Sequence, residues 1–419
     1  MRKTAGILLS PTRHLDTDQR NRLRRMAGAR FLSELGTKAA FAALVLRVTE
    51  LTTSATVLSI VLTATVIADA AVTPIAGIVG DLFNRRAVMI ASDLAAAVLY
   101  LALGFMQDLW LLAVVAAMAT AVESFYFPAS GAAVPNLFDK ASLGVVNATF
   151  SQARTAGAIS GPLVAALLTT QFGAGPVFWL NAVTFAVSAF LVSGVSGEFK
   201  ASSLTRSGTE SSNRSAGHVR GFLRILREHP IVPTFIALWI TIQLGTGALW
   251  VALPKLAAEL GSPSTAYATL LTASTIGSFL GAFAAARVLA LTTPAKLLIG
   301  ALIAEAALLL GAGSAAVLVI AVGAMVGFRA AESASGAASY TIFQSVTEDD
   351  VRARASAWVD TATIAAFGIG VALAGPLVDA VGPRYVFATA SVCVTGGVGF
   401  AWRMTKQVRG LGPMETCAT

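Results

Sequence analysis

The chain has 419 residues, of which 56% are hydrophobic and only 12% are charged. A soluble domain carries about 25% charged residues, and folding this chain in water would leave much of its apolar surface exposed to solvent. The composition therefore excludes an ordinary soluble protein and predicts one that lies largely in lipid. The net charge of +8 does not indicate nucleic-acid binding, because the basic residues stand in short clusters between apolar runs.

The cysteine and histidine content argues against a metal site. Cys393 and Cys417 have no metal-ligand spacing, and the three histidines lie outside the apolar runs. The first 26 residues are basic and lack the apolar segment of a signal peptide. We therefore predict no metal, no cofactor and a basic cytoplasmic tail over residues 1–26.

Apolar runs of transmembrane length follow one another along the rest of the chain. A helix needs about 20 apolar residues to cross the hydrocarbon layer, and this measure predicts an all-α membrane protein with twelve transmembrane helices. In chain order they cover residues 27–49, 54–80, 87–106, 109–134, 144–171, 174–196, 229–253, 265–289, 294–312, 315–343, 353–380 and 383–404.

The positions of lysine and arginine predict the orientation of these helices. Most of them lie in the terminal tails and in the loops that follow even-numbered helices, whereas only Lys255 and Arg384 lie in the opposite loops. Positive charge concentrates on the cytoplasmic side of membrane proteins. Both termini are therefore expected in the cytoplasm.

The longest hydrophilic stretch, residues 197–228, is rich in serine and basic residues and predicts a flexible cytoplasmic linker. It divides the chain into an N-terminal six-helix bundle over residues 27–196 and a C-terminal six-helix bundle over residues 229–404. Residues 405–419 form the expected cytoplasmic tail.

The loop between the second and third predicted helices carries the most specific local pattern. It places Gly77, Asp81, Arg85 and Arg86 at a spacing that resembles the loop signature of the major facilitator superfamily, with Asn84 at its turn position. Asparagine tolerates left-handed backbone better than most residues. The resemblance implies a conformational gate in which Asp81 and the two arginines form a charge network between helices. The alternative is that the arginines only anchor the loop in the cytoplasm.

The fifth predicted helix holds Gly157, Gly161 and Pro162 at a spacing that resembles the antiporter motif of drug:proton exporters. Small residues let helices approach closely, and proline frees a backbone carbonyl. Ordinary small-residue packing is the alternative interpretation. A second Gly-Pro pair, Gly375-Pro376, stands at the corresponding place in the second half, which is typical of transporters built from parallel repeats.

Three further stretches are similar to a bacterial group of drug:proton antiporters that holds macrolide-efflux and enterobactin-type siderophore exporters. They are Phe178–Phe185, Gly221–Pro230 and Gln344–Arg354. The resemblance implies the major facilitator fold, with two six-helix bundles that alternate access to a small-molecule substrate and protons. It also implies a multi-pass protein of the bacterial inner membrane.

Ionisable residues inside the predicted spans are candidates for proton coupling, because a charge in the membrane interior is costly and usually functional. In the first half these are Asp69, Glu123 and Glu34, with Arg154 as the expected counter-charge. Burial raises the pKa of a carboxyl group and a nearby cation lowers it, so a movement that alters both would load and release a proton. A static ion pair that fixes helix register is the alternative for each.

The second half places Arg329 and Glu332 on one face of the tenth span and Asp360 in the inner part of the eleventh. The third and sixth helices of each half face lipid in the fold that the resemblance implies, and they carry few charges. Asp93 is expected near the cytoplasmic end of the third span. Glu305 is an exception, because it places a charged residue in the ninth span, which is the third helix of the second half. The sequence offers no explanation for it.

We expect a proton-coupled exporter of hydrophobic or amphipathic compounds, such as drugs, macrolide-like compounds or siderophore-like metabolites. The alternative is a proton-coupled uptake symporter for a small solute. An enzyme is not expected, since the sequence has no catalytic residue set, no HExxH motif and no phosphate-binding Gly-Lys-Ser/Thr loop. We expect a monomer whose partners are the lipid bilayer, protons and a small-molecule substrate.

Overall fold

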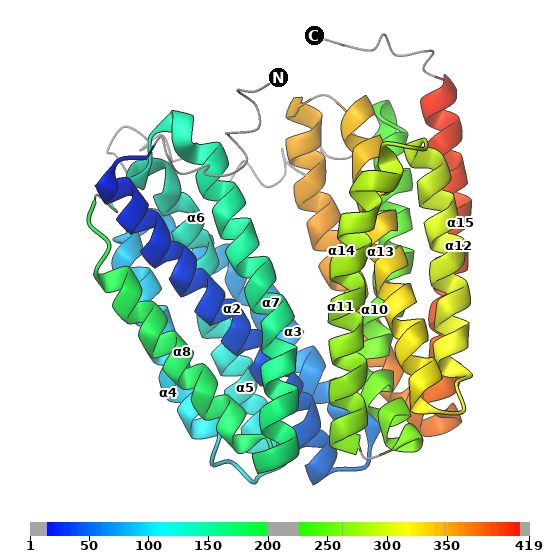
Figure 1. Ribbon diagram of the computed structural model, residues 1–419, viewed down its shortest axis with the longest axis horizontal. Helices are drawn as coiled ribbons and strands as arrows, with labels where there is room; N and C mark the ends of the chain where they lie inside the picture. Colours follow the sequence, from blue (N-terminus) through cyan, green and yellow to red (C-terminus); the bar gives the residue numbers. More distant parts are fainter. Residues whose placement is uncertain (1–14, 198, 200–225, 262, 348, 411–419) are drawn as a thin grey trace. The chain divides into compact units, whose positions relative to one another are not determined.

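The computed structural model describes residues 15–197, 199, 226–261, 263–347 and 349–410, and Figure 1 shows that they form α-helices joined by short loops. Within the helices, the side chains of residues 81, 349–354, 357 and 409–410 lie outside the described part. The predicted linker falls almost wholly on residues that are not described. The prediction of an all-α architecture is confirmed.

The chain divides into two compact units. Unit 1 comprises Met1–Thr52 and Ala64–Arg206, and unit 2 comprises Thr53–Thr63 and Ser207–Thr419. One boundary therefore falls inside the predicted linker. The other two fall between Thr52 and Thr53, before the second predicted span, and between Thr63 and Ala64, within that span, whose first residues therefore belong to unit 2.

Unit 1 is built from helices that correspond to the first six predicted spans. They are α2 (Thr17–Leu51), α3 (Ala55–Leu82, which enters the unit at Ala64), α4 (Arg85–Leu103), α5 (Leu109–Glu123), α6 (Tyr126–Leu137), α7 (Leu143–Phe172) and α8 (Gly175–Ser193). Helix α2 packs against α7 and α8, while α4 packs against α5, α6 and α8. The fourth predicted span is interrupted at Ser124 and Phe125, which separate α5 from α6.

Unit 2 holds six long helices among its described residues. They are α10 (Ile231–Leu260), α11 (Pro263–Leu289), α12 (Pro294–Gly313), α13 (Leu318–Val346), α14 (Asp349–Val381) and α15 (Pro383–Gly410). Helix α10 packs against α14 and α15, and α12 packs against α13 and α15. The first and fifth, first and sixth, and third and sixth helices of each half are thus paired in the same way.

Ten segments are long and apolar enough to cross a membrane, by length and composition, in the part of the chain that the structure describes. The chain is therefore a multi-pass membrane protein. Helices α2 and α7 have 35 and 30 residues but are more polar. Helix α2 carries Arg30, Glu34 and Lys38, one turn apart, and α7 carries Arg154 together with uncharged polar residues such as Asn147 and Gln152. The count of twelve spans stays a prediction.

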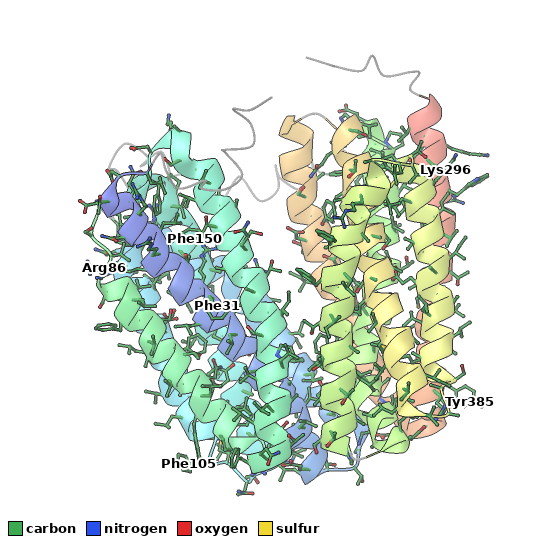
Figure 2. All side chains as sticks on the ribbon, viewed as in Figure 1. Phe31, Arg86, Phe105, Phe150, Lys296 and Tyr385 are labelled. Atoms are coloured by element: carbon green, nitrogen blue, oxygen red, sulfur yellow. The ribbon has the colours of Figure 1, made fainter. Side chains whose placement is uncertain are left out.

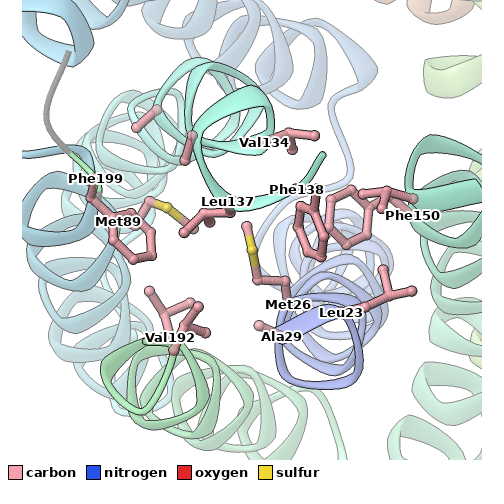
Figure 3. Packing of buried hydrophobic residues seen from close by; sticks show 14 of the residues in the cluster. Leu23, Met26, Ala29, Met89, Val134, Leu137, Phe138, Phe150, Val192 and Phe199 are labelled. Carbon is pink, nitrogen blue, oxygen red and sulfur yellow. The ribbon is translucent and has the colours of Figure 1, made fainter. Parts of the chain in front are cut away.

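Apolar side chains fill the inside of unit 1 at one end of its bundle. Leu23 and Met26 of α2 meet Met89 of α4, Leu137 of α6 and Val192 of α8 in a cluster of buried residues (Figure 3). Large apolar residues also cover the outside of both units, where Figure 2 labels Tyr385 and Phe105 as examples. An apolar exterior around an apolar core is expected of helices that face lipid.

Asn84 corrects one expectation about the loop before α4. Its φ and ψ are −64° and 113°, so the backbone is extended and not left-handed. Its side-chain oxygen accepts a hydrogen bond from the backbone N–H of Arg86 at 3.0 Å. Asn84 is therefore the N-cap of α4, a position where asparagine is favoured for its short polar side chain.

Replacing Asn84 with alanine should lower the free energy of unfolding by about 1 kcal/mol, because the cap of α4 is lost. Asn84→Ser should retain most of the stability. Thermal unfolding of the purified variants checks both outcomes, and an unchanged midpoint for Asn84→Ala would contradict the capping role.

Candidate functional site

A group of charged side chains from α2 and α7 meets in unit 1. The Glu34 carboxylate lies 3.5 Å from the Lys38 ammonium nitrogen, one turn along α2. Its other oxygen lies 3.5 Å from Nε of Arg154 on α7. The side chain of Glu34 is 20% exposed, whereas those of Lys38 and Arg154 are 47% and 54% exposed. The structure thus brings together two of the predicted coupling residues, with two cations around one carboxylate.

Glu123, the last residue of α5, extends this group. Its Oε2 accepts a hydrogen bond from the Thr37 hydroxyl of α2 at 3.1 Å. The hydroxyl of Tyr100 on α4 approaches the same carboxylate, and Lys38 and Glu34 interact with it electrostatically. Glu123 therefore belongs to the same cluster as Glu34, and we call Glu34, Lys38, Glu123 and Arg154 the unit 1 charge cluster.

Asp69 lies on α3 beside the break between α5 and α6. Its carboxylate accepts hydrogen bonds from the Ser124 hydroxyl at 2.6 Å and from the Thr73 hydroxyl at 3.3 Å. Within the described residues, its partners are therefore hydroxyl groups and not a cation.

Arg30 joins this region, although sequence reasoning did not select it. It donates a hydrogen bond to the Ser130 hydroxyl at 2.8 Å and lies 4.6 Å from the ring centre of Phe150. The ring centre of Phe127 lies 5.3 Å from the guanidinium carbon of Arg30 and 5.2 Å from that of Arg154, so both guanidinium groups lie near the same ring. The signal was present, because Arg30, Glu34 and Lys38 are spaced by four residues on one helix face.

Two glycines of the antiporter-like motif explain how α7 comes close enough to place Arg154. A methyl group on Gly157 would lie 2.6 Å from the Phe31 carbonyl oxygen, and one on Gly161 would lie 2.5 Å from that of Leu35. Backbones therefore touch where α7 crosses α2. Pro162 is buried inside α7 directly after this contact.

The two arginines of the predicted gate, Arg85 and Arg86, contact different groups. The guanidinium group of Arg85 is buried and donates to the carbonyl oxygens of Gly80 and Ala132, at 3.3 and 3.0 Å. Arg86 lies over the ring of Phe199, and the space beside Gly77 is open. The side chain of Asp81 lies outside the described part, so the predicted charge network stays a prediction.

Unit 2 holds a second polar group on α12 and α13. Arg329 and Glu332 form an ion pair on one face of α13, as the spacing predicted. Glu332 also accepts a hydrogen bond from Thr246 of α10 at 3.4 Å. Glu305 is fully buried, and its Oε2 accepts a hydrogen bond from Ser335 at 3.2 Å. Because Glu305 also interacts with Arg329 and Glu332, the unexplained carboxylate belongs to this group.

Two acidic residues of α14 lie apart from that group. Asp360 is exposed and interacts with the hydroxyl of Tyr340. Asp379, which sequence reasoning did not select, accepts hydrogen bonds from the backbone N–H groups of Ala55 and Thr56, both at 2.8 Å. It also accepts bonds from the hydroxyls of Ser54 and Thr56. Asp379 thus caps the N-terminus of α3, where a negative charge is favourable.

The sequence pattern of the Major Facilitator Superfamily matches residues 26–244 and again residues 235–415. The two matches together cover most of the chain, and each corresponds to one set of the helices described above.

Curated relatives are similar over shorter stretches. An uncharacterized MFS-type transporter, YfiS of Bacillus subtilis, is 25% identical over 119 residues, which is 28% of each chain. The multidrug resistance protein MdtG of Proteus mirabilis is 28% identical over 124 residues, 29% of this chain and 31% of that protein. MdtG of Salmonella typhi is 23% identical over 194 residues, 45% of each. The matched stretches thus span less than half of these relatives.

Solved structures share the fold over nearly the whole chain. A bacterial homologue of the human lysosomal transporter Spinster, crystallised in an inward-facing and unoccupied conformation, has a TM-score of 0.70 at 13% identity, and the match covers 94% of this chain and 98% of that one. The nucleoside transporter NupG, crystallised as a point mutant, has a TM-score of 0.66 at 12% identity, covering 94% and 100%.

Proposed function

This chain belongs to the Major Facilitator Superfamily, and we propose on that basis that it is a proton-coupled exporter of hydrophobic or amphipathic small molecules in a bacterial inner membrane. The observation that carries the proposal is the unit 1 charge cluster, in which one carboxylate, Glu34, lies between the cations Lys38 and Arg154. Similarity to multidrug resistance proteins supports export of drug-like compounds as the direction and the substrate class. Macrolide-like and siderophore-like compounds are included in that class.

The proposed coupling uses the carboxylates of Asp69, Glu123 and Glu34. A carboxylate near a cation stays ionised, and one that loses the cation and its water takes up a proton. Arg154 is the cation whose distance from Glu34 would change, because it comes from a different helix. In each cycle a proton would bind on one side of the membrane and leave on the other, while the substrate moves in the opposite direction.

We further propose twelve spans in two six-helix halves, with both termini in the cytoplasm and residues 197–228 as a cytoplasmic linker. Helices α2 and α7 would complete the ten apolar spans found among the described residues. The charged residues of α2 and α7 contact partners on neighbouring helices. Such partners are what allow ionisable residues inside a membrane. Labelling of single introduced cysteines from either side of the membrane tests this topology.

Neutralising Asp69 should abolish export. In bacteria that lack their own efflux pumps, the intact protein should lower the accumulation of a fluorescent dye or a macrolide, and a proton uncoupler should cancel this effect. Asp69→Asn keeps the size of the side chain and one oxygen that can accept from Ser124 and Thr73 but removes the charge, so we expect accumulation to return to the level of cells without the protein. Asp18→Asn, at an exposed position in the first turn of α2, is the matched control.

Transport that survives the separate neutralisation of Asp69, Glu123 and Glu34 would contradict the coupling proposal. Everted vesicles distinguish the alternative function. An exporter accumulates substrate inside such vesicles when their interior is acidified, whereas a proton symporter that serves uptake would not.

A further inference from the structure

The proposed transport cycle does not use Asp93, a buried carboxyl group near the middle of α4. Asp93 is 1% exposed, and it lies in the central part of α4, which spans Arg85–Leu103, rather than near the end where it was expected. The helices that pack against α4 are α5, α6 and α8. Protein therefore encloses the Asp93 carboxyl on the face of α4 that carries it.

The surroundings of Asp93 contain hydroxyl groups and, within the described helices packed around it, no cation. The Ser188 hydroxyl of α8 faces the carboxyl, and the Tyr126 hydroxyl of α6 faces both of them. On α5, the charged group that interacts with Asp93 is the carboxylate of Glu123. Helices α5, α6 and α8 contain no lysine, arginine or histidine. On α4 itself, Arg85 stands about 12 Å away along the helix axis and is bound to two carbonyls.

Four buried polar atoms make no hydrogen bond of good geometry among the described residues, although Ser188 lies close to the other two side chains: both carboxyl oxygens of Asp93, Oγ of Ser188 and the hydroxyl oxygen of Tyr126. Leaving an ionised carboxylate buried without a partner costs several kcal/mol or more. A bound proton removes that cost, because a neutral carboxylic acid can both donate to and accept from neighbouring hydroxyls. A divalent cation fits less well, because such ions take about six to eight oxygen ligands.

Tyr126 connects this place with the unit 1 charge cluster. Its hydroxyl interacts electrostatically with both Asp93 and Arg30. Arg30 in turn interacts with Glu34 and Arg154. The charge on Asp93 is therefore coupled, through a phenol and a guanidinium group, to the carboxylate that the proposed cycle uses.

We propose that Asp93, enclosed by Ser188 and Tyr126, is a proton-binding site of unit 1 and carries a proton in the resting protein. This proposal rests on the proposed function for its role in transport. The chemical step is a simple proton transfer: water delivers a proton to a carboxylate oxygen, an O–H bond forms, and the same bond breaks when the proton leaves. Removing that proton should place a negative charge beside Tyr126 and attract Arg30, which would weaken the attraction between Arg30 and Glu34.

Infrared spectroscopy of the purified full-length protein tests the site directly, because the C=O stretch of a protonated carboxyl differs from the bands of a carboxylate. At neutral pH the wild-type protein should show a protonated carboxyl band that Asp93→Asn lacks. Asp108→Asn, which changes an exposed aspartate that caps α5, should retain the band. A band unchanged in Asp93→Asn would overturn the proposal. A carboxylate band at Asp93 that changes with sodium at constant pH would also overturn it, in favour of a bound sodium ion.

Transport in proteoliposomes tests the role of the proton. Asp93→Asn should exchange substrate at equal concentrations on both sides within about twofold of wild type, yet should lose about tenfold or more of the accumulation driven by a pH gradient, a difference of about 1.4 kcal/mol. Loss of both activities in a folded variant would contradict a coupling role. If Asp93→Asn does not fold, Ser188→Ala should shift the pH at which the infrared band disappears, and an unshifted band would overturn the enclosure by Ser188.

The two proposals fail in different ways. If the pH gradient has no effect on wild-type transport while the band still depends on Asp93, proton-coupled export and the coupling role are both wrong, and the assignment of the bound proton stands. If wild-type transport follows the pH gradient and Asp93→Asn behaves as wild type in both assays, the proposed function stands and the site is wrong.

Discussion

Replacing Arg154 with glutamate is expected to reduce proton-driven export by about tenfold or more, a change of about 1.4 kcal/mol in the transport barrier. The substitution leaves Lys38 as the remaining cation of the unit 1 charge cluster and places a third carboxylate near Glu34 and Glu123. Like charges repel each other, so Glu34 would lose the counter-charge on α7 that the proposed cycle moves. Initial rates of substrate uptake into everted vesicles, at several pH gradients, measure the effect.

The loss should not come from unfolding. The side chain of Arg154 is 54% exposed, and exposed ion pairs contribute about 1 kcal/mol or less to stability. The double variant Glu34→Arg with Arg154→Glu restores opposite charges across α2 and α7 and should recover part of the transport. If Arg154→Glu transports normally, the pair with Glu34 only fixes helix register, and the coupling proposal loses its counter-charge.

Replacing Gly161 with valine is expected to destabilise unit 1 by about 1–3 kcal/mol or more, the range found for overpacked cores. The first added carbon would lie 2.5 Å from the Leu35 carbonyl oxygen and 2.8 Å from Cβ of Lys38. Because the nearest obstacle is backbone, it cannot move aside by changing a rotamer, and α7 must separate from α2. The yield of monodisperse protein in detergent and its thermal unfolding midpoint should both fall.

Gly144 supplies the matched control on the same helix. No described atom lies within 4 Å of a methyl group placed there, so Gly144→Val should change stability by about 0.5 kcal/mol or less. Equal losses for the two variants would show that glycine in α7 matters for its backbone freedom and not for the approach of α2.

The positions of the helices could be predicted well because lipid imposes a minimum apolar length and glycine and proline mark the turns. The span predicted at residues 294–312 is α12, Pro294–Gly313, and Gly173 turns between α7 and α8 with a φ of 78°. Helix ends beyond the apolar runs were missed. Helix α2 begins at Thr17, ten residues before the predicted span, since Asp16 caps it by accepting from the N–H of Gln19.

The side-chain partners could be predicted only in part. The pairs Glu34–Lys38 and Arg329–Glu332 follow from helix spacing, whereas the contact of Glu34 with Arg154 joins residues on separate helices. The burial of Asp93 could not be predicted, because the direction of a side chain around α4 depends on which helices pack against it. Glu305 was unexplained for the same reason, since its partners Ser335 and Arg329 lie on α13.

The interruption between α5 and α6 has a consequence for hydration. The apolar segment Leu109–Leu137 is long enough to cross a membrane, yet its helix stops at Glu123 and restarts at Tyr126. Backbone carbonyls released at such a break cannot be satisfied by lipid and need side chains or water. We therefore expect water to reach the level of Ser124 and Asp69, and amide hydrogens near residues 124–126 to exchange with deuterium sooner than those in the middle of α5 or α8.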